Sequence, residues 1–160
     1  MNKEDILAEV HLAPMRWGFG VLLMYVLGVI LAVLAVRAPE IALGVRIILM
    51  ALGAGALYLG ERSRKIRYIH VILHADGLVD SSGTQITTLE NIRSIDRGAL
   101  AFKPSNGFLL RLHERGPRAW VPGLWWRMGR SVGVGGSTQS GQAKFMAEMI
   151  AARLAARKTG

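Results

Sequence analysis

The sequence contains no cysteine among its 160 residues, which excludes a disulfide framework, metal sites built from thiolates and a cysteine nucleophile. A second absence is charge, since none of the twenty residues from Trp17 to Val36 is charged. At about 1.5 Å per residue, a helix over this run covers the roughly 30 Å hydrocarbon core of a bilayer. The sequence therefore predicts a membrane-spanning helix here.

A second apolar run, Ile41 to Gly60, contains one charged residue, Arg46, close enough to its start for the guanidinium to reach the interface. We expect a transmembrane helical hairpin over residues 17–60. The alternative is a pair of buried helices in a soluble bundle, but such helices keep a polar face, and Val21–Val36 offers only the hydroxyl of Tyr25. A cleaved signal peptide is disfavoured because the first run exceeds the ~7–15-residue apolar core of a signal.

Both runs lack the groups that transport or redox chemistry requires. Apart from the Tyr25 hydroxyl there is no polar side chain in mid-span, hence no ion path or proton relay, and no histidine is present to ligate a haem. Small residues, Gly28 with Ala32 and Ala51 with Gly55, predict closely packed helices. The hairpin is therefore expected to be an anchor and a packing surface.

Positive charge is concentrated after the hairpin. The net charge is +9, and residues 61–160 contain sixteen Lys or Arg against seven Asp or Glu, whereas residues 1–60 contain four of each. A basic domain beside a bilayer is attracted to anionic headgroups. We therefore expect the chain to contact a lipid bilayer, with anionic lipid as a possible ligand, and we expect no nucleic-acid partner.

Basic residues also predict the orientation of the hairpin. Six of them border its outer ends and two, Arg37 and Arg46, border the connection, which favours cytoplasmic N- and C-termini. The aromatic side chains near the ends suit the membrane interface. The predicted interface residues are Trp17, Tyr58, Arg62, Arg64, Lys65 and Arg67.

Residues 1–16 form the predicted N-terminal cytoplasmic segment. Ile6, Leu7, Val10 and Leu12 stand at roughly helical spacing before Pro14, which predicts a short interfacial helix.

Short apolar segments separated by turns follow the hairpin and predict a β domain over residues 64–158. About seven antiparallel strands are expected to form a bent sheet or partly open barrel. The expected strands include 68–74, 78–80, 84–89, one that begins near Ile92, 99–103, 108–113 and 119–121. A loop over 122–136 and a capping helix over 138–157 complete the predicted α+β domain.

The C-terminal helix is expected to begin at an N-cap of Ser137 or Thr138. Its predicted apolar stripe must cover the sheet. The stripe consists of Phe145, Met146, Met149, Ile150 and Leu154.

The order of these segments is similar to that of a known family. A first strand that enters Ala75-Asp76-Gly77-Leu78, then Ile86–Ile92 before a hairpin, and one C-terminal helix resemble the bacterial pleckstrin-homology-like (PH-like) domains of small membrane proteins. The Leu89–Ile92 stretch lacks the tryptophan that is usual there. The resemblance implies a seven-stranded sheet capped by a helix, and a scaffolding or binding role without a fixed ligand.

Gly133-Val-Gly-Gly-Ser-Thr138 precedes the C-terminal helix, where free backbone N–H groups and the helix dipole favour anions. The stretch lacks the lysine of a Walker A loop and the spacing of a dinucleotide fingerprint. It is either a structural loop or an anion site. The candidate anion- or lipid-binding residues are Arg127, Arg130, Gly133, Gly135, Gly136 and Ser137.

A tryptophan cluster near these arginines is the second candidate. Tryptophans in the core of a small domain are common, but two adjacent ones in a loop cannot both easily face inward. An exposed aromatic surface beside arginines is typical of a protein hot spot or a membrane contact. The candidate partner-binding residues are Trp120, Trp125, Trp126 and Met128.

No catalytic constellation or metal site stands out, and we expect no cofactor. His70 and His74 lie four residues apart on a strand, roughly 13 Å from each other, too far to share an ion. The sequence therefore favours a non-enzymatic protein of the bacterial inner membrane that acts as a scaffold or assembly factor for another integral membrane protein. The alternative is an anionic-lipid or phosphoanion sensor.

Overall fold

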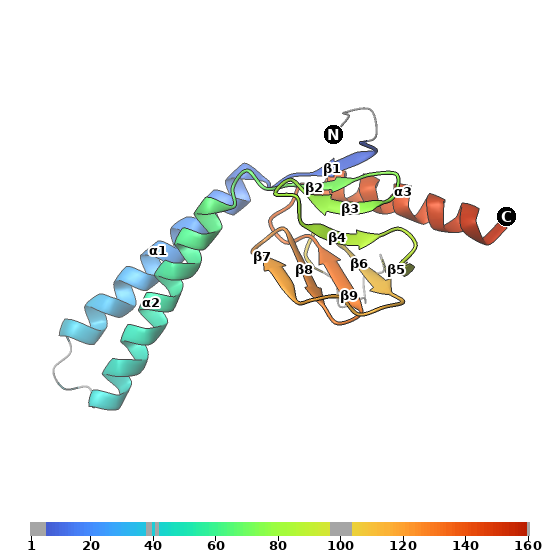
Figure 1. Cartoon of the computed structure of the whole chain (residues 1–160). Coiled ribbons are helices and arrows are strands. Elements are labelled where there is room, and N and C mark those ends of the chain that lie inside the picture. The colour runs from blue at the N-terminus through green and yellow to red at the C-terminus, as the bar shows by residue number, and fades with distance from the viewer. Residues whose placement is uncertain (1–5, 38–39, 41, 97–103, 160) are drawn as a thin grey trace. The chain divides into compact units, whose positions relative to one another are not determined.

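The computed structural model describes residues 6–37, 40, 42–96 and 104–159 (Figure 1). The chain divides into two compact units. Pro14–Arg67 forms a helical pair, and Met1–Ala13 together with Tyr68–Gly160 forms a unit of two antiparallel sheets and a C-terminal helix. These units differ from the predicted domains in two respects. The residues before the first helix join the sheet unit, and residues 64–67, predicted to begin the β domain, belong to the helical pair.

The helical pair consists of α1 (Pro14–Arg37) and α2 (Leu43–Lys65) (Figure 1). Pro14 suits the first turn of a helix, because its missing N–H would have no intrahelical partner there. Both helices are long and apolar enough to cross a membrane, and only 11% and 17% of their most apolar windows are buried. The predicted pair of long apolar helices is confirmed.

Small residues let the two helices approach, but the set on α2 differs from the prediction. Gly28 packs against Gly53 and Leu57, and a Cβ atom added to Gly53 would lie 3.4 Å from the backbone nitrogen of Ala32. Gly55 has nothing within 4 Å of such an atom, and Ala51 is exposed. The predicted Ala51 and Gly55 face is therefore wrong. The buried face of α2 is formed instead by Gly53, Ala56 and Gly60.

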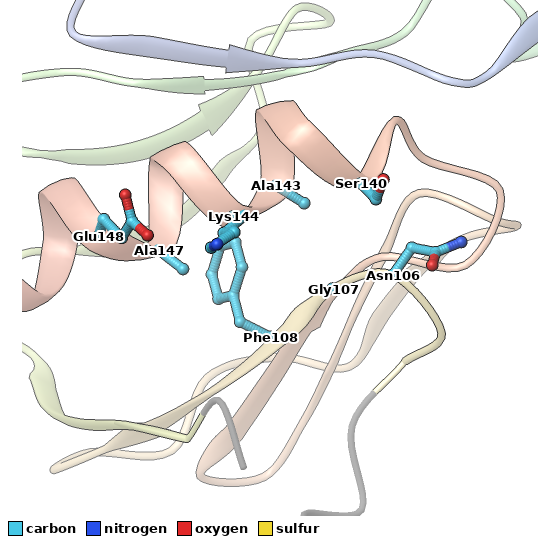
Figure 2. Close-up of a pocket in the computed structure, with 8 residues that line it drawn as sticks. All are labelled: Asn106, Gly107, Phe108, Ser140, Ala143, Lys144, Ala147 and Glu148. Carbon is cyan, nitrogen blue, oxygen red and sulfur yellow. The ribbon is translucent and has the colours of Figure 1, made fainter. Parts of the chain in front are cut away.

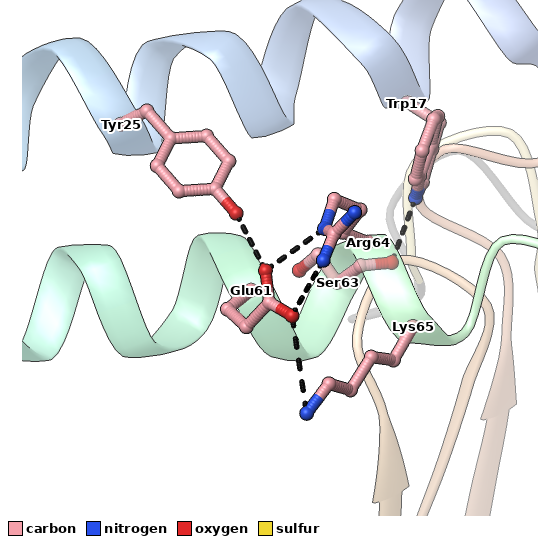
Figure 3. A network of polar contacts seen from close by, with 6 residues as sticks. All are labelled: Trp17, Tyr25, Glu61, Ser63, Arg64 and Lys65. Atoms are coloured by element: carbon pink, nitrogen blue, oxygen red, sulfur yellow. Dashed lines mark hydrogen bonds and ion pairs between the residues drawn. The ribbon is translucent and has the colours of Figure 1, made fainter.

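Polar contacts join the start of α1 to the end of α2 (Figure 3). The Trp17 indole donates to the Ser63 carbonyl at 3.1 Å, and the Tyr25 hydroxyl donates to the Glu61 carboxylate at 2.8 Å. Arg64 donates to both oxygens of the same carboxylate, each at 2.8 Å. The mid-span hydroxyl is therefore satisfied within the helical pair.

Residues 6–12 do not form the predicted interfacial helix. Ala8–Val10 is strand β1, which pairs antiparallel with β2 (Val71–Leu73). Ala8, Val10 and Leu12 are buried, whereas the residues between them are half-exposed, so the true period is two. Tertiary pairing with β2 decides the conformation of this short segment.

The first sheet has the order β1-β2-β3-β4 and is antiparallel throughout. Its later strands are β3 (Gly77–Asp80) and β4 (Gln85–Thr88), both within one residue of the expected starts. The buried carboxylate of Asp80 accepts the backbone N–H groups of Ser82 and Thr84 at 3.0 Å, which closes the turn between them.

The second sheet has the order β5-β6-β9-β8-β7, again antiparallel. Its strands are β5 (Ile92–Asp96), β6 (Phe108–Leu112), β7 (Ala119–Val121), β8 (Trp125–Met128) and β9 (Ser131–Val134). The predicted loop over 122–136 is therefore wrong, because most of it is the β8–β9 hairpin with Gly129 in its turn at φ +60°. The expected strand 99–103 lies outside the described residues. The structure thus describes nine strands instead of about seven.

Helix α3 (Ser140–Thr159) packs on β1, β5 and β6. Its buried face is Ala143, Met146, Ala147 and Ile150, whereas Phe145 is exposed and does not belong to the stripe. Neither Ser137 nor Thr138 is the N-cap, since the helix begins at Ser140 and the Thr138 hydroxyl donates to the Asn106 carbonyl. The largest core side chains beneath α3 and between the strands include Trp125, Phe108, Leu73, Leu78, Ile86 and Leu110.

Candidate functional site

Side chains of strand β8 alternate between the two faces of the sheet, and this divides the predicted site residues into an inward set and an outward set. Trp125 and Arg127 point inward and are only 1% and 8% exposed, whereas Met128 on the other face is 57% exposed. Adjacent tryptophans on a strand take opposite faces of the sheet. Trp125 is therefore a core residue, and Trp126 remains on the outer face.

Arg127 is part of the structure of the sheet unit. Its Nε donates to the Pro117 carbonyl at 2.7 Å, and its Nη1 donates to the carbonyls of Gln85 and Ile86 at 3.0 and 2.6 Å. Since Gln85 and Ile86 lie on β4, the guanidinium links the two sheets. The structure does not bring Arg127 to the surface where an anion would bind.

The backbone N–H groups of the glycine-rich stretch also make hydrogen bonds within the protein. The backbone N–H groups of Gly135, Gly136 and Ser137 donate to the carbonyls of Leu124, Ser105 and Gly123 at 2.7 to 2.8 Å. Gly133 lies within β9. These donors are therefore not available to an anion, and the stretch acts as the structural loop that the sequence left open.

An aromatic surface lies on the outer face of the β7–β8 hairpin. The register pairs Trp120 with Trp126, so both indoles share this face with Met128. Trp120 is 49% exposed. The Trp126 indole crosses Gly133 of β9 so closely that a Cβ atom there would lie 2.4 Å from its Cε2. Three of the four predicted partner-binding residues are thus together.

An arginine hollow adjoins the aromatic surface. Arg93 of β5, Arg111 of β6 and Arg130 of the β8–β9 turn line an open depression of about 410 Å³, together with Ser94 and Leu112. Arg111 donates to the Ser131 hydroxyl at 3.4 Å, and the guanidinium groups of Arg93 and Arg130 have no hydrogen-bond or ion-pair partner among the described residues. The hollow therefore presents uncompensated positive charge.

The two features lie on one continuous face. The register pairs Ser131 with Arg111 on one side and with Met128 on the other, so these three side chains form a row across β6, β9 and β8. We call this surface the Trp/Arg face. It consists of Trp120, Trp126, Met128, Arg93, Arg111 and Arg130.

Arg93 and Arg111 were not among the predicted site residues. Arg111 stands between Leu110 and Leu112, which are 0% and 3% exposed, so the alternation already marked it as an outward cation on its strand. Its proximity to Arg130 depends on the pairing of β6 with β9, which no local pattern reveals. Of the predicted sensor residues, Arg130 alone contributes a side chain to this face, while Gly133 lies beneath the Trp126 indole.

A larger depression of about 520 Å³ lies between α3 and the start of β6 (Figure 2). Phe108, Ala143 and Ala147 give it an apolar lining, and Lys144 and Glu148 stand beside them with opposite charges. Because Lys144 and Glu148 have opposite charges, the side chains that line this depression carry no net charge.

The predicted interface residues all belong to the helical pair or its end. Tyr58 is 63% exposed on α2. Arg67 stacks over the Trp17 ring at 5.7 Å, while Arg64 and Lys65 contact Glu61. This end of the pair therefore holds both the aromatic ring and most of the basic side chains.

Comparison with protein-family models, with curated proteins and with solved structures finds no match to this chain.

Proposed function

We propose that this chain is a non-enzymatic integral membrane protein of the bacterial inner membrane that docks another membrane protein through its Trp/Arg face. The exposure of its helices supports the anchor: Phe19, Ile47 and Leu52 are 57 to 63% exposed. Each such side chain gains roughly 1.5–3 kcal/mol on leaving water. Lipid around α1 and α2 therefore removes the free-energy cost of exposing these apolar side chains to water.

The sheet unit lies in the cytoplasm. Arg16, Arg62 and Arg67 belong to the end of the helical pair where α1 starts and α2 finishes, and basic residues near short spans favour the cytoplasmic side. A reporter that is active only in the cytoplasm, fused after Gly160, is expected to be active. A silent reporter with normal protein levels reverses the orientation.

The layout of the sheet unit supports a PH-like adaptor. Two antiparallel sheets and one C-terminal helix agree with that family's layout, while the strand before the helical pair and the nine described strands depart from the seven expected. Such domains act by presenting a surface.

The Trp/Arg face carries the proposal. Tryptophan, methionine and arginine are the side chains enriched at the cores of protein interfaces, and they dominate binding hot spots. Arg93 and Arg130 offer guanidinium groups without partners among the described residues, so the complementary surface is acidic. The occupant is therefore an apolar segment with acidic residues, on the cytoplasmic side of another integral membrane protein.

Cross-linking in native membranes, followed by quantitative mass spectrometry, tests this docking. Full-length wild type is compared with W120A/W126A, with R93Q/R111Q/R130Q and with a control, Phe145→Ala, which removes an exposed apolar side chain from α3. A membrane protein captured by wild type and the control, but at least tenfold less by both face variants, supports the proposal. Equal capture by all four proteins overturns it.

The arginine hollow supports a second candidate, an anionic headgroup site. Three guanidinium groups around one depression suit phosphate oxygens. Native mass spectrometry of the protein released from mixed anionic and zwitterionic nanodiscs distinguishes the two. Anionic lipid retained by wild type and W120A/W126A, but lost from R93Q/R111Q/R130Q, favours the sensor over the scaffold.

A further inference from the structure

A cluster of metal-binding side chains lies on the first sheet, away from the Trp/Arg face. The β1–β2 register pairs Val10 with Val71, so the next residues outward, His11 and His70, come opposite each other. Glu9 lies two residues before His11 and therefore on the same side of the strand. Strand pairing thus collects two imidazoles and one carboxylate from segments about sixty residues apart.

The geometry of the three side chains is close to that of a chelate. One ligand atom from each lies within 4.8 Å of the others, and His11 Nε2 is 3.6 Å from a Glu9 carboxylate oxygen. The two imidazole rings stack at 4.5 Å with an interplanar angle of 16°. Ligands that share one zinc ion at about 2.0–2.1 Å lie roughly 3.3 Å apart, so the ligand atoms must come closer together. At least one imidazole must also turn out of the stack, because both nitrogen lone pairs have to point at the same ion.

The tautomer of His70 suits metal binding. Its Nδ1 lies 3.2 Å from the Tyr68 carbonyl, a contact that becomes a hydrogen bond in the tautomer with the proton on Nδ1. The Nε2 lone pair is then free for an ion. A histidine ligand whose other nitrogen donates to a backbone carbonyl is the usual arrangement at metal sites.

Hydrogen bonds from other elements hold both histidine backbones. The His11 N–H donates to the Gln142 side chain of α3 at 2.8 Å, and its carbonyl accepts from the Gln139 N–H. His70 is held by Ser81, whose N–H donates to its carbonyl at 2.9 Å. The backbone positions of both histidines are therefore fixed, and only their side chains must turn to bind an ion.

We propose that Glu9, His11 and His70 bind one divalent transition-metal ion, with zinc as the best match and water in the remaining positions. Two imidazoles and one carboxylate prefer such ions over magnesium or calcium, which favour all-oxygen ligands. All three side chains are partly exposed, so an ion and its waters have access. The ion ties the segment that leads into α1 to the segment that follows α2.

Zinc titration of the full-length, tag-free, metal-stripped protein in detergent tests the site. With a competing chromogenic chelator, wild type is expected to bind one equivalent. His11→Ala and His70→Ala should each weaken binding at least tenfold, and Glu9→Gln several-fold. His74→Ala and His113→Ala are the matched controls, since these histidines are not in the cluster, and both should bind as wild type does.

Two further measurements keep the result independent of folding defects. Zinc should raise the thermal unfolding midpoint of wild type and of His74→Ala, but not of His70→Ala. Electron paramagnetic resonance of bound Cu²⁺ should show two coordinated nitrogens in wild type and one in His70→Ala. Undiminished zinc affinity in both His11→Ala and His70→Ala overturns the proposal, as does an equal loss in the His74→Ala control.

Discussion

Gly28 of α1 and Gly53 of α2 face each other at backbone contact: a Cβ atom added to Gly53 would lie 3.1 Å from the Gly28 carbonyl oxygen. The neighbouring atoms are backbone, which cannot rotate away. The distance between the two helices is therefore set at this crossing. A larger side chain at Gly28 or Gly53 would not fit there.

We expect Gly53→Leu to push the two helices apart and to lower stability by about 1–3 kcal/mol, the usual cost of overpacking. The matched control is Gly55→Leu on the same helix, where an added Cβ atom meets nothing within 4 Å. Its effect should stay within about 0.5 kcal/mol. Thermal unfolding midpoints in one detergent compare the two, and equal midpoints would show that the crossing is not close-packed.

Arg127→Met should destabilise the sheet unit by about 2–4 kcal/mol. The substitution leaves three carbonyl groups, those of Gln85, Ile86 and Pro117, without the donor that now satisfies them. Arg130→Met removes the same charge from an exposed turn and should change stability by less than about 0.5 kcal/mol. Chemical denaturation followed by circular dichroism measures both, and a similar loss in the two variants contradicts the structural role of Arg127.

Gly133→Ala should displace the Trp126 indole, because the new methyl group would overlap its ring. We expect an altered near-ultraviolet circular dichroism spectrum and a destabilisation of about 1–2 kcal/mol. Gly141→Ala is the control, since α3 leaves open space there. If Trp126→Phe abolishes the spectral difference between Gly133→Ala and its parent, the signal comes from this indole. A spectrum unchanged by Gly133→Ala argues against the contact.

Much of the fold could be predicted from sequence because the signals were local. The helical pair follows from long runs without charge, and β7 was predicted at Ala119–Val121, the same residues as observed. The β8–β9 hairpin was missed because Gly129 and Gly133 made the segment look like a loop. The alternation of Trp125 and Arg127 with Trp126 and Met128 was the available evidence for a strand.

The sites were harder to predict because each joins separate strands. Arg111 and Arg130 meet only through the pairing of β6 with β9. Glu9 and His11 share a face on a strand but not on a helix, so the incorrect helix over residues 6–12 concealed their proximity to each other. His70 was compared with His74 along the chain, whereas its neighbour in space is His11.

Strand β1 precedes both long helices in the chain, and its partner β2 follows them. The first sheet can therefore be completed only after the ribosome has synthesised the whole intervening segment. Until then β1 has no strand to pair with, and β2, once synthesised, takes β1 as the neighbour that covers its outer edge. Without residues 8–10, the edge of β2 would have no neighbouring strand. The sheet unit therefore needs the segment before the helices as well as the segment after them in order to fold completely.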